Sequence, residues 1–161
     1  MNKVYLKSYY ANMSTREEHI RKYKNKCMEY NTNYLITDTY SIIKLNETYN
    51  MEITNDNGII EKIFDDFKFN FNLNKVDITK DLENFEEKNF RFIKEYSGDI
   101  KEETEIIKYG VDMKRLNNIK KIIKANKIEI VSKYSYDYMY AIKLENTKTN
   151  EYAYLLPIRV Y

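Results

Sequence analysis

The sequence is poor in the residues that build covalent or metal-based sites. It has one cysteine, Cys27, and one histidine, His19. A single cysteine excludes an internal disulfide and a cysteine-based metal cluster. His19 follows Glu17 and Glu18, but no second histidine is present to share a metal, so we interpret it as an exposed or loop-capping residue. Cys27 lies in a strand-like run and is interpreted as a buried structural thiol. We therefore expect no metal and no other cofactor.

Glycine and proline are also scarce. The three glycines, Gly58, Gly98 and Gly110, are isolated, so there is no glycine-rich loop of the kind that cradles phosphates. Adjacent acids such as Asp65 and Asp66 have no organised partner in the sequence and are interpreted as surface residues. No nucleophile, base or carboxylate pair has the pattern of an active site, so we do not expect an enzyme.

Long apolar runs are missing as well. No stretch approaches the length of a membrane span, and the N-terminal residues MNKVYLKSYY lack the apolar centre of a signal peptide. A lone cysteine is typical of a reducing compartment. The sequence therefore predicts a cytoplasmic protein without a membrane partner.

The charges are distributed unevenly. The 161 residues, which fit one domain, carry a formal net charge of only +2. The local balances are +4 over 1–45, −8 over 46–107, +5 over 108–124 and +1 over 125–161. An acidic middle is thus followed by a short, strongly basic segment, and this asymmetry is the first indication of a charged partner.

The C-terminal part has the clearest periodicity. Apolar or aromatic residues alternate with others over 136–144 and over 152–160, and a shorter alternation covers 128–131. A period of two predicts strands with one buried face, so we expect a three-stranded antiparallel meander. The tyrosines at 136, 138 and 140 are predicted to lie in the core, and the alternative is a stacking platform for bases.

A helix is expected just before this meander. Residues 104–109 are predicted to form a strand and Gly110 a turn, and Asp112 is predicted to cap a helix that runs to about Ala125, with Asn126 as its C-terminal stop. Its aliphatic face comprises Leu116, Ile119, Ile122 and Ile123, with Met113 at the margin. Its opposite face is cationic and amide-bearing, and comprises Lys114, Asn117, Asn118 and Lys121, flanked by Lys124. Such a face can follow phosphates, although an ordinary solvated face has the same periodicity.

The N-terminal part is predicted to follow a similar order. A strand or the start of a helix lies near 4–13, and strands are expected at 24–30, 33–38 and 40–45. Two similar units indicate an internal duplication. The middle, an insertion or an incomplete third unit, is predicted to contain a helix at 59–67, a strand at 67–73, a helix at 78–88 and a strand at 89–96.

Two stretches, YLITDTYSIIKL at 34–45 and YAYLLPIRVY at 152–161, resemble signatures of the bacterial DNA polymerase sliding clamp, the beta clamp. In that family a Thr-Asp-Gly turn, followed by an aromatic residue or His, an Arg and a Leu, joins two strands, and the chain closes on an apolar–Pro–apolar–Arg strand. Residues 109–160 resemble the last half-domain of a clamp over its whole length. Thr39 stands where the family has Gly, and Ser41 where it has Arg.

The resemblance implies an α+β fold with one clamp-like domain over 1–161. It would consist of duplicated strand–helix–three-strand units at 1–45 and 104–161, with antiparallel sheets and helices on one face. Residues 46–103 would be an acidic insertion or an incomplete extra unit. The implied protein is a phage-like DNA sliding clamp: a homo-oligomer around duplex DNA that acts as a processivity factor and tethers a polymerase in DNA replication. The basic helix face would then line the pore. The alternative is a clamp-fold interaction protein, a mimic or inhibitor of a host replication or nuclease protein, that does not encircle DNA.

In clamps the two signatures line a groove that accepts short partner peptides. We therefore expect a groove with Tyr40 and Ile42 on one side, and with Leu156, Pro157 and Ile158 on the other, with Arg159 at the rim. Proline cannot donate a backbone hydrogen bond, so it suits an edge beside which a peptide lies. The other interpretation, that these residues simply close the core, has equal support in the sequence.

Overall fold

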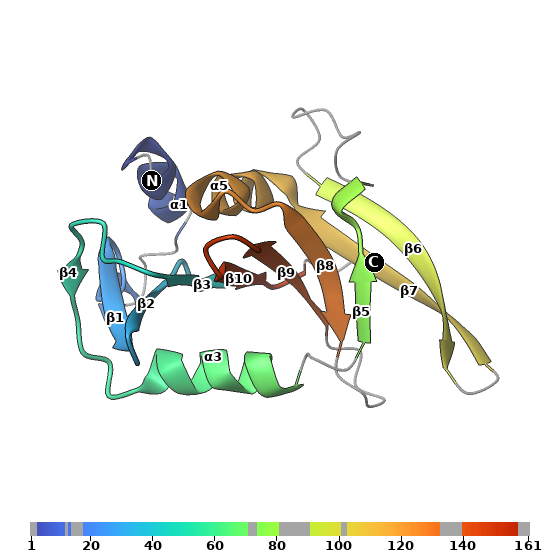
Figure 1. Ribbon diagram of the computed structural model, residues 1–161, viewed down its shortest axis with the longest axis horizontal. Coiled ribbons are helices and arrows are strands. Elements are labelled where there is room, and N and C mark those ends of the chain that lie inside the picture. The colour runs from blue at the N-terminus through green and yellow to red at the C-terminus, as the bar shows by residue number, and fades with distance from the viewer. Residues whose placement is uncertain are drawn as a thin grey trace.

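The computed structural model of the protein describes residues 3–11, 13, 18–70, 74–80, 91–100, 103–132 and 140–157. Within these residues the chain forms an eight-stranded sheet, a separate two-stranded ribbon, and helices that cover both faces of the sheet (Figure 1). The fold is α+β, as the sequence predicts. No helix in this part of the chain is both long and apolar enough to cross a membrane.

The first half of the sheet is an antiparallel meander that follows a helix. The helix is α1, Lys3–Ala11, and a short α2, Glu18–Arg21, comes after it. The strands are β1 Lys26–Tyr30, β2 Asn33–Thr37 and β3 Ser41–Leu45. The predicted strands in this region are confirmed, and the ambiguous N-terminal segment is a helix.

The second half repeats this order. Helix α5, Met113–Ile123, is followed by the strands β8 Lys127–Ser132, β9 Tyr140–Asn146 and β10 Glu151–Leu155, which pair antiparallel in sequence order. This confirms the predicted C-terminal meander. Strand β10 also pairs antiparallel with β3, with Tyr154 opposite Ile42, and so joins the two meanders into one sheet.

The middle of the chain adds the outer strands, one helix and the ribbon. Strand β4, Glu52–Ile53, pairs parallel with β1 at one edge, and β5, Asn74–Asp77, pairs antiparallel with β8 at the other. The order of the sheet is therefore β4-β1-β2-β3-β10-β9-β8-β5. Helix α3 spans Ile59–Asn70, and the ribbon consists of β6, Arg91–Ile100, and β7, Glu103–Asp112.

The helices do not share one face, which corrects the sequence-based expectation. Helices α1 and α5 pack side by side on one face, whereas α3 lies across the other (Figure 1). The α3 helix is held there by aromatic rings, because Phe64 stacks on Tyr152 with centroids 5.4 Å apart and Phe67 stacks on Tyr154 at 5.5 Å. The sheet is thus buried from both sides, and Ile128, Glu129, Ile130 and Val131 are all buried where the alternation predicted one buried face.

The predicted strand at 67–73 is wrong over 67–70, where α3 continues to Asn70. The alternation of phenylalanines at 67 and 69 resembles a strand, but Phe67 lies one helical turn from Phe64 and packs against the same sheet face. Phe69 is left 87% exposed. Residues 71–73 lie outside the described part of the chain.

The structure also tests what the sequence predicts on either side of α5. Gly110 is not in a turn, because it pairs with Ile93 inside the ribbon. Helix α5 ends at Ile123, close to the predicted end near Ala125, and its C-cap Lys124 is left-handed and donates its N–H to the Lys120 carbonyl. Asn126, the predicted stop, instead donates its N–H to the carbonyl of Glu145 in β9.

Strand β10 also ends before the predicted boundary. It stops at Leu155, and Leu156 is 42% exposed. Three predicted features lie outside the described residues. They are the part of the predicted helix 78–88 beyond Lys80, the tyrosines at 136 and 138, and the predicted strand residues 158–160. The predicted strand at 89–96 corresponds to β6 from Arg91 onward.

The aromatic packing of α3 generates a stability prediction. Replacing Phe64, which is fully buried, by alanine is expected to lower the free energy of unfolding by about 3–4 kcal/mol, because it removes a large ring and leaves a cavity. Phe69→Ala on the same helix is the matched control and is expected to change the free energy of unfolding by less than about 0.5 kcal/mol. Urea denaturation measures both values, and similar losses in the two variants would contradict the described orientation of α3.

Candidate functional site

The turn between β2 and β3 is built around the carboxylate of Asp38, which is completely buried. Its Oδ1 accepts hydrogen bonds from the backbone N–H groups of Tyr40, at 3.0 Å, and Ser41, at 2.8 Å. The Ser41 hydroxyl donates to the same oxygen at 2.8 Å. These donors satisfy one carboxylate oxygen, and they fold residues 38–41 into a compact turn before β3 begins.

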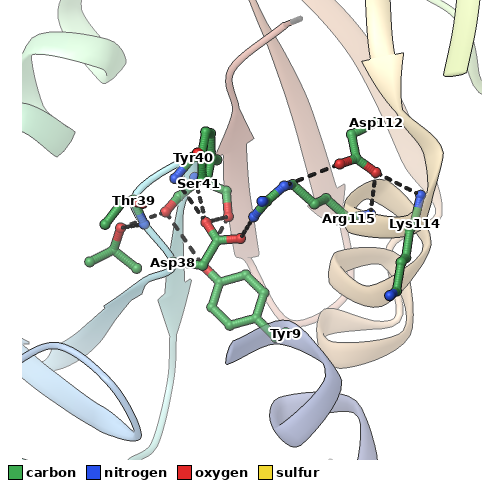
Figure 2. Close-up of polar contacts among 9 residues, drawn as sticks. Tyr9, Asp38, Thr39, Tyr40, Ser41, Asp112, Lys114 and Arg115 are labelled. Atoms are coloured by element: carbon green, nitrogen blue, oxygen red, sulfur yellow. Dashed lines mark hydrogen bonds and ion pairs between the residues drawn. The ribbon is translucent and has the colours of Figure 1, made fainter. Parts of the chain in front are cut away.

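The second oxygen of Asp38 is bound by the other half of the molecule. Arg115, in the first turn of α5, places Nη1 2.5 Å from Asp38 Oδ2, and its Nε lies 3.2 Å from Asp112 Oδ2 (Figure 2). Asp112 caps α5, because its Oδ1 accepts from the N–H groups of Lys114 and Arg115. Arg115 therefore connects the β2–β3 turn to the N-terminus of α5.

Helix α1 contributes a third contact to the same turn. The Tyr9 hydroxyl lies 2.9 Å from the Ser41 hydroxyl and donates to the Ser41 carbonyl at 3.3 Å. Burial, and next the nearby Asp38 carboxylate, raise the pKa of Tyr9 well above its ordinary value. The hydroxyl therefore stays protonated and remains a donor at neutral pH.

Thr39 has an unusual backbone conformation in this turn. Its φ of 76° lies in the left-handed region, which a β-branched residue rarely adopts. Its N–H donates to Thr37 Oγ1 at 3.0 Å, and Thr37 Oγ1 donates to the Ser41 carbonyl at 2.7 Å. Sliding clamps, which this segment resembles, have glycine at the position of Thr39. The backbone of Thr39 keeps the left-handed conformation that glycine adopts easily, and these hydrogen bonds hold it there.

The turn forms one wall of an apolar depression of about 250 Å³, which we call the groove. Tyr40 and Ile42 line it from the turn and β3, and Leu156 lines it from the end of β10. The Leu156 N–H donates to the Tyr40 carbonyl at 2.9 Å, so the two predicted sides of the groove are in direct contact. Pro157 follows at the edge and is half-buried, whereas Ile158 and Arg159 lie outside the described residues.

The opposite wall of the groove comes from α3, which the sequence analysis did not anticipate. Ile59, Ile63 and Phe67 line it, and the first two are 49% and 41% exposed. On the turn side, Tyr40 is 45% exposed, and the guanidinium carbon of Arg115 lies 3.9 Å from the centroid of its ring. A volume of this size accommodates one or two apolar side chains, which is less than a drug-sized ligand occupies.

The predicted basic face of α5 is only partly exposed. Lys114, Lys121 and Lys124 are exposed, whereas Asn117 and Asn118 are half-buried. The Nδ2 of Asn118 is buried without a hydrogen-bond partner among the described residues. The two amides are therefore less accessible than the helix periodicity predicts.

Helix α1 extends this basic face, which the sequence analysis also missed. It packs beside α5, and the Lys121 ammonium lies 5.4 Å from the centroid of the Tyr5 ring. Lys7 of α1 is exposed, and the sequences of α1 and α5 contain no acidic residue. A cationic surface thus spans two helices that lie about a hundred residues apart in the chain.

The Asp38–Arg115 ion pair generates the second prediction. Its side chains are 0% and 12% exposed, so Arg115→Met is expected to lower the free energy of unfolding by about 3 kcal/mol, because a buried carboxylate loses its counter-charge. Asp38→Asn in the Arg115→Met background should recover part of this loss. As a control, Lys26→Met breaks an ion pair with Glu52, whose side chain is 70% exposed, and should change stability by at most about 1 kcal/mol. Chemical denaturation measures the free energy of unfolding of each variant. Equal losses in Arg115→Met and Lys26→Met would contradict the assignment of Asp38–Arg115 as a buried ion pair.

Comparison with protein-family models, curated proteins and solved structures finds no match to this chain. The functional argument therefore rests on the surfaces described above. A fold by itself does not specify a function, whereas the charge and shape of a surface restrict what can bind to it.

Proposed function

We propose that the protein is a DNA sliding clamp-like processivity factor that associates around duplex DNA and tethers a polymerase. The observation that carries the proposal is the basic surface of α1 and α5, which presents Lys7, Lys114, Lys121 and Lys124 on one side of a continuous sheet. Exposed cations without interspersed acids attract phosphates independently of base sequence. A sliding protein requires this type of contact, because base-specific hydrogen bonds would hold it at one site.

The order of the elements is consistent with the proposed fold. A helix followed by three antiparallel strands occurs twice, and β3 and β10 join the two units into one sheet. The resemblance of residues 34–45 and 109–160 to sliding clamps supports the same interpretation. Since one clamp-sized domain cannot encircle DNA, the proposed activity requires several copies of the chain.

The groove supports a role in partner binding. It lies on the α3 side of the sheet, because Ile42 and Tyr154 face α3 and line it, whereas the basic surface lies on the opposite side. Under this proposal DNA and a partner peptide would occupy different faces of the protein. The apolar wall contributed by α3 also favours the second candidate function, a clamp-fold interaction protein that binds a replication or nuclease protein without encircling DNA.

The DNA-binding proposal predicts a salt-dependent affinity for linear duplex DNA. If two or three phosphates are neutralised per subunit, the slope of log K against log salt is expected to be about −2 to −3 per subunit. Lys114→Glu with Lys121→Glu should abolish this binding in fluorescence anisotropy. The control, Lys62→Glu with Lys68→Glu, makes the same charge change at exposed positions of α3, on the other face of the sheet, and should retain binding.

Two outcomes would contradict the DNA-binding proposal. One is absence of binding by the folded parent protein at low salt, and the other is equal affinity in the two double variants. Either result would favour the interaction-protein function. Circular dichroism spectra of all variants verify that the fold is retained.

The groove predicts that an apolar anchor peptide of the type that clamps accept binds there. Leu156→Ala and Ile63→Ala, on opposite walls, are each expected to weaken binding by about 1–2 kcal/mol, because a few buried anchors provide most of the energy in such contacts. Phe69→Ala removes an exposed ring of α3 that does not line the groove, and should leave the affinity unchanged. Titration of a labelled peptide measures the three effects, and unchanged affinity in both groove variants would exclude this site.

A further inference from the structure

The sheet edge formed by β1 is only partly covered by another strand. Strand β4 pairs with β1 at Lys26 and Cys27, and the Thr54 N–H donates to the Cys27 carbonyl at 2.8 Å. Strand β4 ends before Thr54, and the chain then runs away from this edge toward α3, whereas β1 continues to Tyr30 (Figure 1). The last residues of β1 therefore have no strand beside them on this side.

Glu29 carries the unpaired backbone groups of this edge. In an antiparallel pair such as β1 and β2, residues two apart direct their N–H and C=O groups to the same side of the strand. The Cys27 carbonyl is bound on the β4 side, so the N–H and C=O groups of Glu29 point to that side as well. No described residue bonds to them there. An extended segment that lies beside β1 can therefore pair with Glu29, as in recognition by strand addition.

A cavity of about 340 Å³ lies beside this unpaired position, and we call it the edge cavity. Glu29 lines it from β1, Ile53 from β4, Asp56 from the loop before α3, and Glu61 from the first turn of α3. Its volume is at the lower end of the range of ligand pockets, about 300–1,000 Å³, and suits one long side chain. The lining residues include three acids and no lysine or arginine, which favours a cationic occupant.

The three acids of the edge cavity differ in the partners they already have. Asp56 accepts hydrogen bonds from the N–H groups of Gly58, at 3.1 Å, and Ile60, at 2.7 Å, and so caps the start of α3. Glu29 is exposed and Glu61 is half-buried, and neither forms an ion pair with a described residue. Two carboxylates therefore remain available to cations of a partner.

These two carboxylates belong to opposite faces of the sheet edge. The Tyr30 ring packs edge-on against Phe64 of α3, with centroids 5.1 Å apart, so Tyr30 faces α3. Successive side chains of a strand alternate, so Glu29 faces the other side of the sheet, whereas Glu61 is on α3 itself. A segment paired with β1 has the same alternation. Two consecutive residues of that segment therefore point one toward Glu61 and the other to the side of Glu29.

We propose that the β1 edge binds an extended segment of a partner protein that carries two consecutive basic residues. The backbone of the segment pairs with the N–H and C=O groups of Glu29. One basic side chain enters the edge cavity and meets Glu61, and the next one lies on the opposite face and meets Glu29. Backbone pairing supplies the extended orientation, and the two acids select the sequence.

A second copy of the chain fits this edge less well. If two copies pair through β1 about a two-fold axis, the unpaired Glu29 of one lies beside that of the other, and like charges across neighbouring strands repel. The edge cavity also shares no residue with the groove and lies away from the basic helices. The proposal is therefore independent of DNA binding and of peptide binding in the groove.

NMR titration of the isotopically labelled whole chain with the peptide TVRRVT, without DNA, tests the proposal. The amide signals of Glu29 and Thr54 are expected to shift, and exchange of the Glu29 amide hydrogen with solvent should slow, because that N–H becomes hydrogen-bonded. The peptide TRVRVT has the same composition but directs both arginines to one face. It should bind about two- to fivefold more weakly, because one exposed ion pair is lost.

Protein variants and a modified peptide separate strand pairing from general charge attraction. Glu29→Gln and Glu61→Gln should each weaken binding of TVRRVT about two- to fivefold. The control Asp66→Asn removes an exposed acid of α3 that does not line the edge cavity, and should leave the affinity unchanged. Methylation of the backbone nitrogens of TVRRVT should abolish binding, because it removes the donors of the added strand.

Three outcomes would overturn the proposal. The first is no shift of the Glu29 amide at any concentration of TVRRVT, and the second is shifts that cluster at Ile63 and Leu156 of the groove instead. The third is equal affinity for TVRRVT and its methylated form, which would indicate charge attraction without strand pairing.

Discussion

The buried carboxylate of Asp38 is the constraint on which the arrangement of the two halves depends. A charge removed from water is tolerated only when donors surround it, and Asp38 receives two backbone N–H groups, a hydroxyl and a guanidinium. Three of these donors come from its own turn, and the fourth comes from Arg115 in the second half of the chain. The turn and the N-terminus of α5 must therefore move together.

This constraint extends to the surfaces on which the proposed functions depend. Arg115 stacks on Tyr40, which lines the groove, while its backbone N–H is bound by the Asp112 cap beside Lys114. A single side chain thus positions part of the groove wall and the start of the basic helix. Rigid support of this kind reduces the entropy lost when a partner binds.

The acidic middle of the chain is integrated into the fold. It provides α3, whose rings cover one face of the sheet and whose isoleucines form a groove wall, and it provides the strands at both edges of the sheet. Its remaining described part is most of the β6–β7 ribbon, whose strands pair with each other and not with the eight-stranded sheet. The segment that resembles an insertion in the sequence therefore creates features that a simple pair of repeated units would lack.

The sequence by itself determined the elements that depend on local interactions. The strands of the C-terminal meander were predicted from period-two alternation, and the start of α5 was predicted from Asp112, whose side chain accepts from the N–H groups of Lys114 and Arg115. It also placed Tyr40, Ile42 and Leu156 together, through the resemblance to clamp signatures. Only the tertiary structure decided the extension of α3 through Phe67, the position of α1 beside α5, and the pairing of Arg115 with Asp38. These features depend on contacts between residues far apart in the chain. Periodicity and spacing show that a ring is to be buried or a charge paired, but they do not specify which distant residue covers the ring or pairs with the charge.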